Sequence, residues 1–95
     1  MGAWGSIVVD FGATPTASAA TATVTAQAGI LATSAIEAWM DCRNASADHT
    51  AVEHATENLK VNAYNIVPGV GFDVYLEPTL GTSFGKWNVF WVWTN

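Results

Sequence analysis

The sequence predicts an all-β fold, a small antiparallel β-sandwich or jelly-roll-like domain with one short helix around residues 50–57. Short stretches in which apolar and polar residues alternate recur along the chain, and this alternation is typical of strands with one buried face. Glycine and proline turn signals separate the stretches roughly every 8–12 residues, the spacing found in sandwiches and barrels. At 95 residues the chain has room for one domain, residues 1–95, with a single core.

Two strands are predicted in the first third of the chain. Residues 7–11 are β-branched and aromatic and lie between Gly5 and Gly12, which favours a strand. Residues 13–35 are rich in alanine, threonine and serine, and within them threonines alternate with small apolar residues. This alternation favours a strand over a flexible linker. Its polar face would carry Thr21, Thr23 and Thr25, and its apolar face Ala20, Ala22, Val24 and Ala26.

Residues 35–41 are compatible with two structures. In a strand, Ile36, Ala38 and Met40 would share the buried face. In a helix, Ile36, Trp39 and Met40 would form a stripe at positions i, i+3 and i+4. The sequence alone therefore leaves strand and helix open between Ile36 and Met40.

A capped helix is predicted next, after a loop over residues 42–48. Thr50 and Glu53 have the spacing of a capping box, in which the hydroxyl and the carboxylate each accept a hydrogen bond from a free amide at a helix start. A helix of about two turns, ending at Glu57, follows from this signal.

Asp48, His49, Glu53 and His54 form the densest polar cluster of the sequence. The simplest interpretation is structural, with Asp48 near the positive end of the helix dipole. Two alternatives stay open. His49 and Glu53 could share a helical face in a metal or polar site that symmetry-related copies complete, or the histidines could act as a pH switch. His54 is expected to point away from His49, and the chain lacks further ligands for zinc, so no metal site is assigned.

The last third of the chain predicts an antiparallel meander of three strands, over residues 59–65, 72–77 and 87–95. Pro68 and Gly69 suit the centre of a type II turn between the first two strands. Residues 81–85 supply the turn before the last one.

The final strand is apolar on both faces. Successive side chains of a strand point to opposite sides, which separates Trp87, Val89, Trp91 and Trp93 from Asn88, Phe90, Val92 and Thr94. A strand of this kind is covered on both faces. We expect a second sheet on one side and a sister molecule or larger partner on the other. The predicted core and interface residues are Trp87, Val89, Phe90, Trp91, Val92 and Trp93.

Composition excludes several classes of partner. The net charge is −5 and only three residues are basic, so no basic patch is available for nucleic acid or an anionic membrane. The single cysteine, Cys42, excludes an intrachain disulfide and suits folding in a reducing cytoplasm. Neither a signal peptide nor a membrane-spanning segment is expected. Charged residues make up only 12% of the chain, about half the usual fraction, which favours a subunit of a larger assembly.

No catalytic constellation is predicted. The carboxylates lie on separate segments, and no Gly-x-Ser-x-Gly elbow is present. The PGVG stretch at residues 68–71 lacks the pattern of phosphate-binding loops. We therefore expect neither an enzyme nor a cofactor.

Several motifs together resemble a family of small virion proteins. They are VDFG at residues 9–12, IEAW at 36–39, DHT at 48–50, EH at 53–54, NIVPGVGF at 65–72 and WNVFWVW at 87–93. Their order and spacing resemble proteins of tailed bacteriophages, mostly described as hypothetical or as virion structural proteins, over nearly the whole chain. Tyr64 departs from the small residue of that pattern, which affects packing more than function.

The resemblance implies a structural virion protein, similar to small β-sandwich proteins that decorate capsids or attach to necks and tails, and it brings no catalytic residues. We expect a capsid decoration or cement subunit that assembles in the host cytoplasm and resides on the virion. It would self-associate as a homotrimer or another ring and bind the major capsid protein or another virion protein. The alternative is a head-fibre or tail-fibre tip that binds a host-surface glycan, with Trp4 and Trp39 as the best ligand platform.

Overall fold

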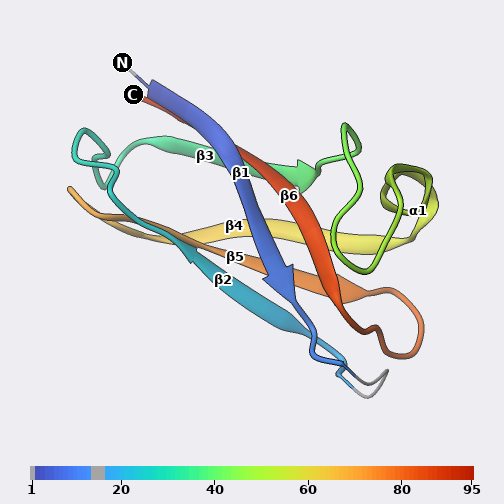
Figure 1. Cartoon of the computed structure of the whole chain (residues 1–95). Helices are drawn as coiled ribbons and strands as arrows, with labels where there is room; N and C mark the ends of the chain where they lie inside the picture. Colours follow the sequence, from blue (N-terminus) through green and yellow to red (C-terminus); the bar gives the residue numbers. More distant parts are fainter. Residues whose placement is uncertain (1, 14–16) are drawn as a thin grey trace.

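Two three-stranded antiparallel sheets pack face to face in the computed structural model, which describes residues 2–13 and 17–95 (Figure 1). Along the chain the elements are β1 (Gly2–Asp10), β2 (Ala20–Val24), β3 (Ala35–Met40), α1 (Ala51–Thr56), β4 (Leu59–Val67), β5 (Gly71–Pro78) and β6 (Lys86–Thr94). One sheet has the order β1–β6–β3 and the other β2–β5–β4. The predicted all-β sandwich with one short helix is confirmed for the described residues.

Strand β6 lies at the centre of one sheet, and β5 lies at the centre of the other. Strands β4 and β5 form the expected hairpin, but the chain then crosses to the opposite layer. There β6 pairs with both β1 and β3, so that Trp91 lies between Gly5 and Ala38. The predicted meander of the last three strands is therefore wrong for β6. A strand that is apolar on both faces suits a central position, because neighbours on both sides help to cover its outer face.

The core lies between the sheets and is built mainly from the two central strands. Strand β6 contributes Trp87, Val89, Trp91 and Trp93, and β5 contributes Phe72, Val74 and Leu76. The terminal indoles are thus covered by the second sheet of the same chain. Gly5 makes room for one of them, since a Cβ atom there would stand 2.7 Å from the Trp91 ring.

The folded chain exposes as little surface as an ordinary monomer. Its accessible surface is 5225 Å², close to the roughly 5,200 Å² typical of a compact monomer of this mass. Burial of the core therefore requires no partner.

Local signals are confirmed at the helix and at one turn. At the start of α1, the amide of Glu53 donates to Thr50 Oγ1, and the amide of Thr50 donates to Glu53 Oε1. In the turn before β5, the amide of Val70 donates to the carbonyl of Val67 at 3.0 Å. Gly69 has a φ of 75°, as the third position of a type II turn requires.

The ambiguous segment is strand β3, with Ile36, Ala38 and Met40 packed against the core. The largest differences from the predicted strand boundaries lie in the first two strands. Strand β1 starts at Gly2 because it pairs with β6 along its full length. Strand β2 ends at Val24, and Ala26 lies in the left-handed region with a φ of 61°. No helix in the described part of the chain is long and apolar enough to cross a membrane.

Candidate functional site

The outer face of the β1–β6–β3 sheet carries an exposed aromatic cluster. Strand register places Phe90 beside Trp39 of β3, and Val92 beside Trp4 of β1. Trp4 is 64% exposed and Trp39 is 45% exposed. Together with Arg43 they line a shallow, open depression of about 400 Å³. We call this surface the aromatic face: Trp4, Trp39, Arg43, Phe90 and Val92.

The rings of the aromatic face stack across the three strands. The Trp4 and Phe90 centroids lie 5.6 Å apart with a 16° angle between planes, and Trp39 and Phe90 lie 5.0 Å apart at 23°. Such offset stacking is a favourable aromatic geometry. Because Phe90 stands on the central strand, the two indoles flank it from opposite sides, and each covers part of the Phe90 ring.

A buried carboxylate holds a cation on this face. The Arg43 side chain donates from Nε to Asp41 Oδ1 and from Nη2 to Asp41 Oδ2, both at 2.8 Å. Ser6 Oγ also donates to Asp41 Oδ2, at 2.9 Å. These bonds, those from Arg43 above all, hold the pKa of Asp41 well below its usual range although burial opposes the shift. The guanidinium carbon of Arg43 is thereby placed 5.1 Å from the Phe90 ring centroid.

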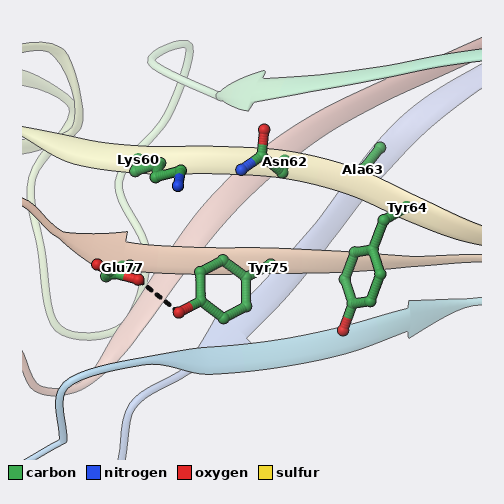
Figure 2. Close-up of a pocket in the computed structure, with 6 residues that line it drawn as sticks. All are labelled: Lys60, Asn62, Ala63, Tyr64, Tyr75 and Glu77. Atoms are coloured by element: carbon green, nitrogen blue, oxygen red, sulfur yellow. Dashed lines mark hydrogen bonds between the residues drawn. The ribbon is translucent and has the colours of Figure 1, made fainter.

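The outer face of the β2–β5–β4 sheet is polar and carries both tyrosines (Figure 2). Lys60, Asn62, Tyr64, Tyr75 and Glu77 line an open depression there of about 660 Å³. Figure 2 shows both tyrosine rings on the same side of the sheet. We call this surface the tyrosine face: Thr21, Thr23, Lys60, Asn62, Tyr64, Asp73, Tyr75 and Glu77.

Hydrogen bonds orient the acidic groups of the tyrosine face. Tyr75 Oη donates to Glu77 Oε1, and this bond raises the pKa of Tyr75. Asp73 accepts from Thr23 Oγ1 and from Asn65 Nδ2, both at 2.8 Å. Asn65 has a φ of 58° and lies where the β4–β5 register shifts. The irregularity thus turns its amide towards the carboxylate of Asp73.

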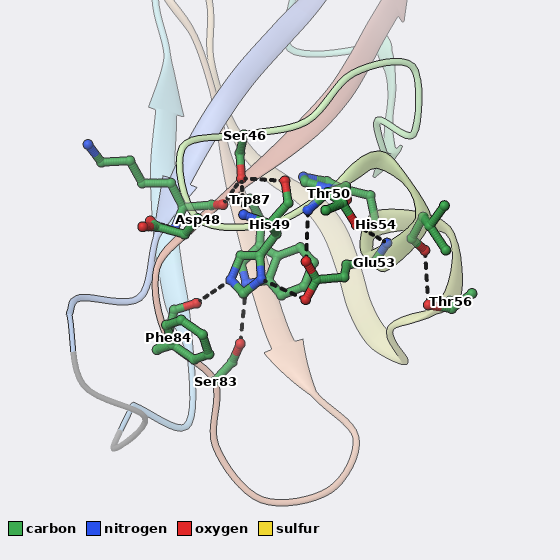
Figure 3. A network of polar contacts seen from close by, with 12 residues as sticks. Ser46, Asp48, His49, Thr50, Glu53, His54, Thr56, Ser83, Phe84 and Trp87 are labelled. Carbon is green, nitrogen blue, oxygen red and sulfur yellow. Dashed lines mark hydrogen bonds and ion pairs between the residues drawn. The ribbon is translucent and has the colours of Figure 1, made fainter.

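The predicted polar cluster is a structural network around Trp87 (Figure 3). The His49 ring stacks on Trp87 with centroids 3.6 Å apart, and its Nε2 donates to the Phe84 carbonyl at 2.8 Å. His54 is 1% exposed. Its Nδ1 donates to the Thr50 carbonyl at 2.7 Å, and its Nε2 accepts from the Asn88 amide at 2.9 Å. Because a carbonyl only accepts and an amide only donates, His54 is neutral with its proton on Nδ1.

The network corrects one expectation from the sequence. His54 does not point away from His49, since both rings pack on Trp87 and their centroids are 6.5 Å apart. Asp48 also has a contact that the sequence did not suggest, since it accepts from the amide of Lys86 at 2.7 Å and anchors the beginning of β6.

Glu53 lies near His49 as the spacing suggested, with Nδ1 and Oε2 3.5 Å apart. Its carboxylate also accepts the bond from Thr50, which is the main cause of its lowered pKa. Among the described residues, no group of three or more histidine, cysteine or carboxylate side chains could hold a metal ion. The cluster joins the helix and the 79–85 loop to the start of β6.

The predicted core and interface residues divide between two faces. Trp87, Val89, Trp91 and Trp93 lie in the core, whereas Phe90 and Val92 are half-buried on the aromatic face.

The tyrosine face was not singled out from the sequence. Its signal was present in the alternating polar residues of two neighbouring strands, which are Lys60, Asn62, Tyr64, Asp73, Tyr75 and Glu77. No protein-family model, curated protein or solved structure matches the chain.

Proposed function

We propose that the protein is a structural virion subunit of a tailed bacteriophage, a capsid decoration or cement protein that self-associates through the aromatic face. The observation that supports this function is the exposure of Trp4 and Trp39 beside Phe90 on the outer face of the β1–β6–β3 sheet. Tryptophan and arginine are enriched at the centres of protein interfaces. The motif resemblance described above supports assembly in the host cytoplasm and a location on the virion.

The charges on this face are self-complementary. Glu37 lies near the start of β3 and Arg43 lies just beyond its end, so that Trp39 is between them in sequence. In a contact of two-fold symmetry, the same patch of both copies meets in opposite directions. Two aromatic faces stacked in this way would bring Arg43 of each copy to Glu37 of the other. A sister copy is therefore the occupant that the face suits best.

The exposed aromatic area indicates a weak contact. At about 250 Å² per fully exposed tryptophan, Trp4 and Trp39 together offer roughly 270 Å². A stable interface buries about 800 Å² on each partner. Isolated copies would therefore associate weakly, and attachment to the major capsid protein or another virion protein would strengthen the contact by raising the local concentration.

Sedimentation velocity over a series of protein concentrations tests the self-association. The wild type is expected to shift from monomer to the pair that a two-fold contact closes, whereas a ring such as a trimer would require a contact between two different patches. The double variant Trp4→Ser/Trp39→Ser should remain monomeric, and Leu80→Ser, which alters a 90% exposed residue outside both faces, should behave as wild type. A wild type that stays monomeric at every concentration contradicts the proposal.

A charge variant tests the two-fold contact itself. Glu37→Lys would place two cations opposite each other and should weaken the association. Glu57→Lys, at the exposed end of α1, changes the net charge equally and should leave it intact. Mass spectrometry of the purified virion would establish whether the subunit is part of the particle.

A second candidate function is recognition of a host-surface glycan by a fibre tip. The observation that favours it is the tyrosine face, whose side chains can exchange hydrogen bonds with hydroxyl groups. Trp39 and Trp4, the platform that the sequence suggested, each stack against Phe90 and have part of their ring surface covered.

A further inference from the structure

We propose that the tyrosine face is a binding site for an uncharged saccharide. The inference deepens the glycan-binding function considered above and places it on residues that the aromatic face does not share.

Strand register arranges the side chains in rows across the sheet. Lys60 lies opposite Glu77. In the next row Asn62, Tyr75 and Thr21 stand side by side, and in the third row Tyr64, Asp73 and Thr23 do so. All of these positions alternate with buried or partly buried residues of the same strands, so they share the outer face. Each tyrosine ring therefore has an amide, a hydroxyl or a carboxylate beside it.

The surface is hollowed where the two rings lie. The depression of about 660 Å³ is open to solvent and lies within the usual range of small-ligand sites, about 300–1,000 Å³. Tyr64 is 41% exposed, and Tyr75 is partly buried between its neighbours. An open site of this size could hold a short oligosaccharide along the sheet, with the C–H face of a sugar ring against a tyrosine.

Some polar side chains of the tyrosine face are held by hydrogen bonds within the protein, and others have no such bond to a described residue. The bond from Tyr75 to Glu77 and the bonds from Thr23 and Asn65 to Asp73 hold the acidic side chains in place. Within the described residues, the side chains of Lys60 and Asn62 have no hydrogen bond or ion pair of their own. A saccharide hydroxyl both donates and accepts, so it can pair with a fixed carboxylate and a free donor at once.

The balance of charge selects an uncharged ligand. Lys60 stands opposite Glu77, and Asp73 lies two residues before Tyr75 on the same strand face. A phosphate, sulfate or acidic sugar would meet more negative than positive charge here, which is unfavourable. A protein partner is also disfavoured, because lysine, glutamate and aspartate are depleted from protein interfaces. The two outer faces point away from each other, so self-association would leave the tyrosine face open to solvent (Figure 1).

A glycan array tests the proposal, with uncharged hexose and N-acetylhexosamine oligosaccharides as the probes and sialylated and sulfated ones as the charged set. The wild type should bind within the uncharged set. The best uncharged hit is then titrated by amide NMR, and the shifts should gather on β4 and β5. Tyr64→Ser and Asn62→Ala should each weaken binding by about tenfold or more.

Two controls separate this site from the aromatic face. Trp4→Ser/Trp39→Ser should keep the saccharide affinity within about twofold even though it no longer self-associates, so that failure of one proposal is distinguishable from failure of the other. An array with no bound uncharged glycan overturns the site. A preference for charged glycans does so too, as does binding that Trp39→Ser abolishes and Tyr64→Ser leaves intact.

Discussion

The two outer faces of this sandwich have the same architecture and opposite chemistry. Each belongs to a three-stranded antiparallel sheet with one central strand. On the β1–β6–β3 sheet, Trp4 and Trp39 stack against Phe90. On the β2–β5–β4 sheet, Tyr75 is hydrogen-bonded to Glu77, and polar residues surround both tyrosines. Folding demands apolar residues only on the inner faces, which leaves the outer faces free to differ in chemistry.

The faces also differ in how they hold their charged groups. Asp41 is buried beneath the aromatic face and paired with Arg43. Asp73 lies partly exposed on the tyrosine face and accepts only from uncharged groups among the described residues. The aromatic face therefore contains an ion pair that contributes to stability, whereas the acidic groups of the tyrosine face are held by uncharged hydrogen-bond donors.

The largest expected effect on stability comes from a substitution in the core, between the two sheets. Trp87→Ala removes a fully buried indole that also supports both histidines, and it should lower the free energy of unfolding by about 3–5 kcal/mol. Urea denaturation followed by circular dichroism measures this change. Leu80→Ala, at a 90% exposed position, should cost little by comparison. Equal losses for the two variants would contradict the assignment of Trp87 to the core.

The next largest effect on stability is expected at Asp41, and it should distinguish Asp41 from Asp73. Asp41→Asn should cost about 1–3 kcal/mol near neutral pH, because Arg43 and Ser6 lose a charged acceptor. Since the pKa of Asp41 is depressed in the fold, its contribution is present above its ordinary value of 3.8 and is lost as the pH falls through the folded value. As the pH falls below about 4, the free energy of unfolding should therefore decrease less in Asp41→Asn than in the wild type.

Asp73→Asn provides the matched control for this comparison. It should have a smaller effect at neutral pH, because Asp73 pairs with no cation among the described residues. Denaturant midpoints of both variants, measured from neutral to acidic pH, decide the outcome. A larger loss in Asp73→Asn than in Asp41→Asn would reverse the roles assigned to the two faces.

A smaller effect on stability is expected from the exposed rings. Trp39→Ser removes one stacked pair and should cost about 0.5–1.5 kcal/mol. Iodide quenching of tryptophan fluorescence gives an independent measurement. In dilute protein, quenching should come from Trp4 and Trp39 and should nearly vanish in Trp4→Ser/Trp39→Ser, since Trp87, Trp91 and Trp93 are buried. Substantial quenching of the double variant would show that the core indoles are accessible.

The smallest expected change is a shift in one titration on the tyrosine face. The hydrogen bond to Glu77 raises the pKa of Tyr75, so Glu77→Gln should lower that pKa towards the ordinary value of 10.0. Ultraviolet titration of the two tyrosines follows the change, and Tyr64→Phe leaves Tyr75 as the only tyrosine. An unchanged titration curve in Glu77→Gln would rule out the hydrogen bond that orients Tyr75.

Local patterns in the sequence determined most of the secondary structure and the two faces of β6. Period-two alternation placed Trp91 and Phe90 on opposite faces, because the side chains of a strand alternate wherever its partners lie. The capping box at Thr50 and the type II turn at Gly69 were equally predictable. Each of these signals depends on a few adjacent residues.

Only the tertiary structure decided which distant residues meet. The crossing of β6 to the opposite sheet, the packing of His49 and His54 on Trp87, and the joining of Tyr64 and Tyr75 on one face all depend on strand partners far apart in sequence. Local periodicity sets the face on which a side chain lies but leaves the neighbouring strand open, and lengthening a connecting loop adds little entropic cost. The burial of the indoles between the sheets selects one pairing, and that pairing creates both outer faces.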